Sequence, residues 1–106
     1  MPPVINITPH ELQLLLQTGS IVLIDVREVH EFEHERIEEA LNFPMSTFDP
    51  DEVLQISDGK EIVFQCRSGH RSAHAAEEFF TSDASYKHLD GGIIAWKING
   101  GKTICT

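Results

Sequence analysis

Residues 61–72 read EIVFQCRSGHRS, and this stretch decides which fold the chain is expected to adopt. Residues 61–65 form a short β-branched and apolar run, which is typical of a strand buried in a parallel sheet. Residues 66–72 follow at once, and the next segment places Ala73, Ala76 and Phe80 on one helical face. The stretch therefore predicts a buried strand, a tight loop and a helix over residues 72–80.

The segments on either side continue the alternation of strands and helices. Residues 21–26 form a continuous apolar run and are predicted as a second buried strand, with weaker strands at residues 40–43 and 86–89. Helices are predicted at residues 9–18, at 28–35, from Asp49 to just before Gly59, and after Gly92. The predicted fold class is α/β, with a mainly parallel central sheet flanked by helices on both faces.

Size and charge limit the classes of function. The chain of 106 residues is expected to form a single domain, residues 1–106, because two half-sized cores would each be marginal. Its 17 acidic and 8 basic residues give a net charge of -9, which argues against nucleic acid or an anionic membrane as partner. Two cysteines are too few for a disulfide framework, and neither a signal peptide nor a membrane-spanning run is evident. A cytoplasmic protein is expected.

Cys66 stands where the strand at residues 61–65 meets the predicted helix. In parallel sheets ligands bind beyond the carboxyl ends of strands. The unpaired backbone N–H groups and the dipole at a helix start favour negative charge there, and Arg67 and Arg71 add full positive charges. We therefore expect Cys66 to be a nucleophilic thiolate that is open to solvent.

The other residues of the loop strengthen this interpretation. Gly69 allows the backbone to turn its amides inward, and Ser68 and Ser72 carry hydroxyl groups that can donate to sulfur or to an oxyanion. The competing interpretation makes Cys66 a small buried hydrophobic residue at a strand end. That interpretation gives no reason for two guanidinium groups, two hydroxyl groups and a glycine within six positions.

Three motifs together resemble the rhodanese family of sulfurtransferases in its small single-domain form. They are Asp25-Val26-Arg27-Glu28, the Cys66–Ser72 loop, and Leu89-Asp90-Gly91-Gly92 followed by Trp96. Their order and spacing resemble the family's over nearly the whole chain, from about Ile5. One departure stands before Asn42-Phe43-Pro44, where Glu35–Ala40 reads ERIEEA and the family often has Gly-His-Ile-Pro-Gly-Ala.

The resemblance implies a transfer of sulfane sulfur without a metal or organic cofactor. The Cys66 thiolate would attack the outer sulfur of a small anionic donor such as thiosulfate, release sulfite and hold the sulfur as a persulfide. A thiol or cyanide would then accept it. The implied substrate-binding residues are those that follow the cysteine: Arg67, Ser68, Gly69, His70, Arg71 and Ser72. The alternative is a persulfide carrier that serves a protein sulfur acceptor, to which the acidic surface would dock.

Two rival chemistries are less favoured. Residues 30–34 read HEFEH, a match to a zinc-protease pattern, but a catalytic zinc needs a long helix and a third ligand, whereas this segment fits a short acidic helix. No metal site is therefore expected. Cysteine phosphatases have a similar loop, but in that loop five residues lie between the cysteine and the arginine. Here four residues separate Cys66 from Arg71. By resemblance, the shorter loop suits sulfur rather than a phosphoryl group.

Five residues outside the loop could also contribute to the site or to the core. Asp25 and Arg27 are expected to be mainly structural, through pairing with each other's neighbours and bonds to loop backbone, and Trp96 to belong to the core. Arg36 stands where the family often carries histidine, so it is a candidate for the substrate rim. Cys105 is expected to be a free tail thiol; the alternative is a resolving cysteine that forms a disulfide with Cys66.

Overall fold

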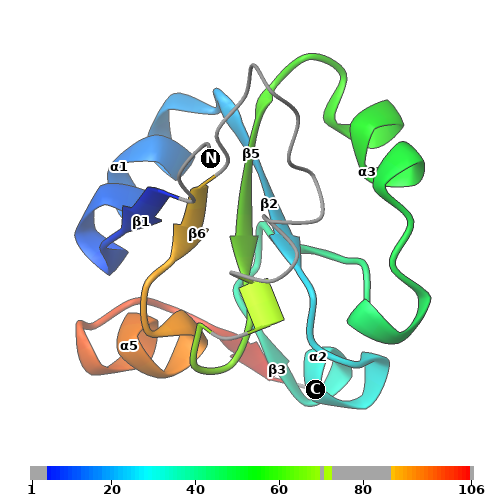
Figure 1. Ribbon diagram of the computed structural model, residues 1–106. Helices are drawn as coiled ribbons and strands as arrows, with labels where there is room; N and C mark the ends of the chain where they lie inside the picture. The colour runs from blue at the N-terminus through cyan, green and yellow to red at the C-terminus, as the bar shows by residue number, and fades with distance from the viewer. Residues whose placement is uncertain (1–4, 70, 73–86, 106) are drawn as a thin grey trace.

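The central sheet is parallel and has five strands in the order β1-β6-β5-β2-β4 (Figure 1). The computed structural model describes residues 5–69, 71–72 and 87–105. The strands are β1 (Ile5–Ile7), β2 (Ile21–Asp25), β4 (Leu41–Asn42), β5 (Glu61–Gln65) and β6 (Lys87–Leu89). The predicted α/β class is confirmed, and β5, which leads into Cys66, lies in the middle of the sheet.

The helices begin and end close to the predicted positions. They are α1 (Pro9–Thr18), α2 (Val29–His34), α3 (Pro50–Ser57) and α5 (Gly92–Ile98), with a 3-10 turn, η1 (Met45–Thr47). Thr8 and Glu11 form a capping box at the start of α1, and the Asp49 side chain accepts a hydrogen bond from the Asp51 amide at the start of α3. Arg71 and Ser72 have helical backbone, and the remainder of the helix predicted at residues 72–80 lies outside the described residues.

Alternate residues of the central strands point to opposite faces of the sheet, and both faces are covered. Leu23 and Val63 pack in one cluster, which includes Leu12 of α1 and Trp96 of α5. The next residues along the same strands, Ile24 and Phe64, belong to a second cluster. This cluster also includes Cys66, just after β5, and Val53 of α3. Figure 1 shows α1 and α5 on one side of the sheet and α3 on the other. Burial on both faces explains the continuous apolar runs of β2 and β5.

A second, two-stranded sheet was not predicted. Its strands are β3 (Glu35–Arg36) and β7 (Ile104–Cys105), which pair antiparallel. β3 occupies the start of the segment where the sequence departs from the family pattern. The Glu35 carboxylate accepts hydrogen bonds from Lys97 and Thr103. No helix within the described ranges has the length and apolar character needed to cross a membrane.

Candidate active site

The backbone after β5 curls around the sulfur of Cys66. The amide of Gly69 donates a hydrogen bond to Cys66 Sγ at 3.0 Å, and the hydroxyl oxygen of Ser72 lies 3.5 Å from the same atom. Gly69 has φ 108°, a conformation that residues with a side chain rarely adopt. Glycine at this position therefore allows the amide to point at the sulfur.

The start of α5 holds the other side of this loop. The amides of Ile93 and Ile94 donate to the carbonyl oxygens of Cys66 and Arg67, at 2.8 and 3.1 Å. Gly92 permits this approach, because a Cβ atom there would lie 2.4 Å from the Cys66 carbonyl oxygen. The Gly91-Gly92 pair of the third motif thus fixes the backbone around the cysteine.

Cys66 is buried, with 1% of its surface exposed. Its side chain packs in the same cluster as Ile24, Phe64 and Val53. The expected position open to solvent is therefore wrong for this conformation. The physical reason is that Cys66 directly follows β5, a strand with both faces covered. Its side chain lies in the same hydrophobic cluster as that of Phe64, two residues earlier.

The guanidinium of Arg71 is bound by a carboxylate of the protein and is not left open for an anionic substrate. Its Nη1 and Nη2 atoms donate to the two carboxylate oxygens of Glu31 at 2.6 and 3.0 Å. The Arg71 hydrogen bond is the largest cause that lowers the pKa of Glu31, from 4.5 to about 2, and Glu31 in turn raises the pKa of Arg71. A negative charge on Cys66 would raise the pKa of Arg71 further, so the guanidinium lies within electrostatic range of the sulfur.

Asp25 and Arg27 are structural, as expected, but they pair with each other rather than with each other's neighbours. The Arg27 guanidinium donates to both oxygens of the Asp25 carboxylate, the shortest contact being 2.8 Å, and both side chains are buried. Arg27 also donates to the backbone carbonyl of Glu35 at 2.6 Å. The side-chain amide of Asn42 donates to the backbone carbonyls of Asp25 and Arg27. The pair ties the end of β2 to the segments that carry α2 and β4.

Comparison with known proteins places the chain in a family. Residues 8–99 match the rhodanese-like domain. The chain belongs to the rhodanese-like family. It is 34% identical to a sulfurtransferase of Allochromatium vinosum, over 83% of this chain and 82% of that protein. A rhodanese-related protein from Thermoplasma volcanium has a similar crystal structure, with a TM-score of 0.78 and 26% identity, over 94% of this chain and 97% of that one.

The chain is also similar to a longer protein. It is 37% identical to protein slr1261 of Synechocystis over 96% of this chain, but it spans only 57% of that relative's length. The family and the sulfurtransferase relative together support a role in sulfur transfer.

The remaining loop residues of the rhodanese-like site lie at the surface or outside the described residues. Arg67 and Ser68 are exposed, and His70 lies outside the described part of the chain. Arg67 lines a pocket of 390 Å³, together with residues of α2, its flanking segments and α5: Arg27, His30, Glu31, His34, Glu35, Ile93, Ile94 and Lys97. The pocket is therefore lined by Arg67 of the Cys66 loop and by residues of the HEFEH segment.

The HEFEH histidines lie in a helix of six residues, α2. The pocket beside His30 and His34 is lined by charged side chains of both signs: Arg27, Arg67, Lys97, Glu31 and Glu35. Within the described ranges, no group of three or more His, Cys, Asp or Glu side chains is placed to hold a metal ion.

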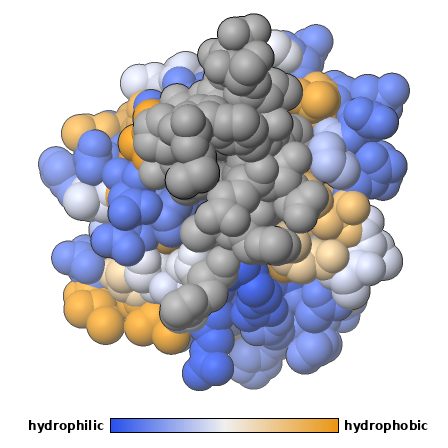
Figure 2. All heavy atoms as spheres, in the orientation of Figure 1, coloured by the Kyte–Doolittle hydropathy of each residue, from blue (hydrophilic) through white to orange (hydrophobic). Residues whose placement is uncertain are grey.

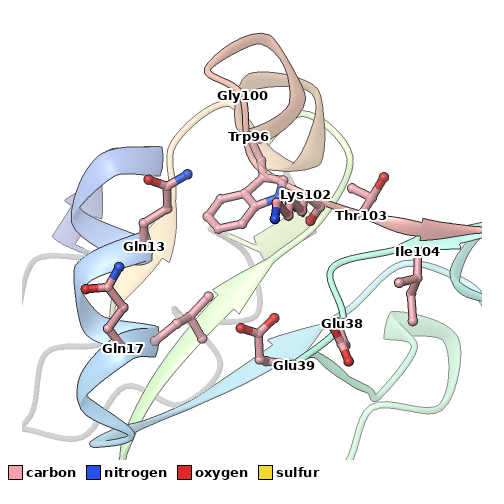
Figure 3. Close-up of a pocket in the computed structure, with 10 residues that line it drawn as sticks. Gln13, Gln17, Glu38, Glu39, Trp96, Gly100, Lys102, Thr103 and Ile104 are labelled. Atoms are coloured by element: carbon pink, nitrogen blue, oxygen red, sulfur yellow. Dashed lines mark hydrogen bonds between the residues drawn. The ribbon is translucent and has the colours of Figure 1, made fainter.

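Arg36, the rim candidate, has its guanidinium 5.1 Å from the centre of the Phe32 ring. Cys105 is a free, exposed thiol in β7, and Trp96 is a core residue, as expected. A second pocket, of 410 Å³, lies between α1 and the segment after α5, with Trp96 and Gln13 in its wall (Figure 3). Its described lining includes no residue of the Cys66 loop.

Outside the grey atoms, most of the surface shown in Figure 2 is hydrophilic. A hydrophobic patch lies toward α5, whose residues Ile94 and Ile98 are exposed.

Two residues near the sulfur were missed by sequence reasoning. The ring of His88, in β6, lies with Nδ1 3.1 Å from Ser72 Oγ, and its Nε2 atom is hydrogen-bonded to Asn6 Oδ1 in β1. Burial lowers the pKa of His88, and the carboxylate of Asp90 acts in the opposite direction. The available signal was a histidine next to Leu89 in the short strand predicted at residues 86–89.

Proposed function

We propose that this rhodanese-like protein is a sulfurtransferase that carries sulfane sulfur as a persulfide on Cys66. The observation that carries the proposal is the 3.0 Å hydrogen bond from the Gly69 amide to Cys66 Sγ. An N–H group directed at sulfur stabilises the negative charge of the thiolate that attacks the donor. A small buried cysteine in a purely packing role needs no such donor.

The reaction exchanges one sulfur–sulfur bond for another. The Cys66 thiolate attacks the outer sulfur of thiosulfate or a similar donor, the new bond forms, and sulfite leaves with the electron pair of the broken bond. A thiolate or cyanide then attacks the terminal sulfur and releases Cys66 as a thiolate. These steps need only a nucleophilic thiolate and donors for negative charge, so the proposal includes no metal or organic cofactor.

Arg67 is the residue proposed to attract the anionic donor. It is exposed and lines the pocket beside the loop, whereas the Arg71 guanidinium is bound by Glu31. The sequence resemblance supports the same substrate-binding role for Ser68, Gly69, His70 and Ser72. Because Cys66 is 1% exposed, a donor reaches the sulfur only when the atoms that cover it move aside.

A second candidate function is a persulfide carrier that exchanges sulfur with a protein. Two observations favour it: Glu31 compensates the charge of Arg71, and the chain carries a net charge of -9. Both disfavour a free small anion, and an acidic surface suits a basic protein partner. A reducing compartment such as the cytoplasm would keep Cys66 available for either function.

The test uses the reduced Cys105→Ser protein, so that Cys66 is its only thiol. The protein is incubated with thiosulfate, and its intact mass is measured before and after cyanide is added. Gain of one sulfur atom, followed by its release as thiocyanate, supports the enzyme. Sulfur gained only from a persulfidated protein supports the carrier, and gain by Cys66→Ser would contradict both.

A further inference from the structure

A continuous chain of polar side chains leads from the buried sulfur to the edge of the sheet. Cys66 Sγ lies 3.5 Å from Ser72 Oγ, which lies 3.1 Å from His88 Nδ1, and His88 Nε2 contacts Asn6 Oδ1. Cys66, Ser72 and His88 are all buried. Bulk water therefore has little access to the thiol proton, and these side chains offer it a path.

The hydrogen-bond directions follow from which atoms can donate. Asn6 Oδ1 only accepts, so His88 Nε2 carries a hydrogen, and Nδ1 of the neutral ring is then an acceptor. The Ser72 hydroxyl donates either to His88 Nδ1 or to the Gly69 carbonyl at 3.2 Å, and in both cases its oxygen can accept from the thiol. A neutral His88 is thus a base linked to the Cys66 thiol through a single hydroxyl group.

We propose that Ser72 and His88 form a proton relay that takes the thiol proton of Cys66 and holds it on His88 while the sulfur is anionic, with Asn6 orienting the ring. The S–H bond breaks as its proton passes to Ser72 Oγ, and the Ser72 proton passes to His88 Nδ1. The Ser72 hydroxyl then donates to the sulfur anion, and Nδ1–H donates to Ser72. The product is a thiolate and an imidazolium; no oxidant or reductant takes part.

The surroundings of His88 fit a base that is neutral at rest. Burial is the main cause that lowers its pKa, and Asp90, on the loop after β6, is the charged group that favours the imidazolium. The neighbouring Lys87 is paired with Glu61 of β5. On β1 the ring meets the uncharged amide of Asn6. A carboxylate at position 6 would therefore raise the basicity of the ring directly.

The relay rests on the proposed function, because sulfur transfer requires Cys66 as an anion, but its test needs no sulfur donor. The rate at which iodoacetamide alkylates Cys66 is measured against pH in Cys105→Ser protein. Asparagine in place of His88 can still hydrogen-bond to Ser72 but cannot take a proton. His88→Asn should therefore lower the alkylation rate near neutral pH about tenfold or more and move the profile to higher pH, since the thiol proton has no base to hold it and the thiolate loses the nearby imidazolium charge.

Asn6→Asp should move the same profile to lower pH, because a carboxylate stabilises the imidazolium. Asn6 is exposed on β1, so this variant is expected to fold. His10→Asn, on the exposed side of α1, serves as the matched control and should leave the profile unchanged. A merely structural role predicts shifts in one direction for both variants, in proportion to lost stability.

Unchanged profiles in both His88→Asn and Asn6→Asp would overturn the relay, whether or not the protein accepts sulfur. If His88→Asn does not fold, the shift expected of Asn6→Asp decides the matter alone. A wild-type protein that accepts no sulfur from any donor, yet has the two opposite shifts, would retain the relay and lose the proposed function.

Discussion

Arg71 of the Cys66 loop and Glu31 of α2 form an ion pair with two hydrogen bonds, at 2.6 and 3.0 Å. The two residues are forty positions apart in the chain. Their pairing ties the helix start after Cys66 to the helix that contains the HEFEH segment. It also binds the guanidinium of Arg71, a residue expected to bind substrate, to a carboxylate of the protein.

Loss of the Glu31 charge should release Arg71 for an anionic donor. In Glu31→Gln, we expect a lower KM for thiosulfate, because the guanidinium is no longer neutralised. Stability should fall by about 1 kcal/mol or less, since the pair is partly exposed. Steady-state kinetics and urea unfolding measure the two effects. A higher KM would indicate that Glu31 holds Arg71 in the orientation that substrate binding requires.

The low pKa of Glu31 predicts a specific dependence of stability on pH. Its pKa is about 2 in the folded protein against an ordinary 4.5. The unfolded chain therefore binds more protons between these values, so the contribution of Glu31 is fully present above pH 4.5 and is lost as pH falls toward 2. Urea unfolding at several pH values should show a smaller acid loss in Glu31→Gln than in the wild type. Glu52→Gln, on the exposed side of α3, should behave like the wild type.

Gly92→Ala should disturb the site through the backbone. Its Cβ atom would lie 2.4 Å from the Cys66 carbonyl oxygen and 2.5 Å from the Arg67 carbonyl, at a φ of +60°. The matched control is Gly100→Ala, which has a similar φ of +83° but no heavy atom within 4 Å of the added carbon. Both variants should lose about 1 kcal/mol from backbone strain. Only Gly92→Ala should lose more than that and also change the alkylation rate of Cys66; equal effects would argue against the contact.

Asp25→Asn should destabilise the fold strongly. The substitution leaves the guanidinium of Arg27 buried without its countercharge, which typically costs about 3 to 5 kcal/mol. Chemical denaturation of the variant measures the loss. A loss below about 1 kcal/mol would mean that the bonds from Arg27 to backbone carbonyls hold the segment without the carboxylate.

Sequence patterns predicted the parts of the fold that depend on local repetition. β2 and β5 have continuous apolar runs because both faces of the sheet are covered, and the start of α1 follows from the Thr8–Glu11 capping box. β1 was missed because Ile5-Asn6-Ile7 is too short to show a period, and its pairing with β6 joins positions 82 residues apart. The two-residue strands β3 and β7 were missed because their pairing joins Glu35 to Cys105, positions that are distant in sequence.

In the candidate site, too, the sequence predicted features formed by neighbouring residues and missed contacts between distant ones. The loop from Cys66 to Ser72 was found because its residues are adjacent in sequence. The Glu31–Arg71 pair and the contact between His88 and Ser72 join residues that are distant in sequence. The burial of Cys66 was likewise not predicted, because it depends on how residues from several elements pack around the end of β5.

The most direct test of the central claim is peptide mapping of Cys105→Ser protein that has been exposed to a sulfane sulfur donor, small or protein-bound, with unreacted thiols blocked. The additional sulfur atom should lie on the peptide that contains Cys66 and should disappear after treatment with cyanide. A Cys66 peptide that remains an ordinary blocked thiol with every donor, or additional sulfur found elsewhere in the chain, would contradict sulfur transfer through this residue.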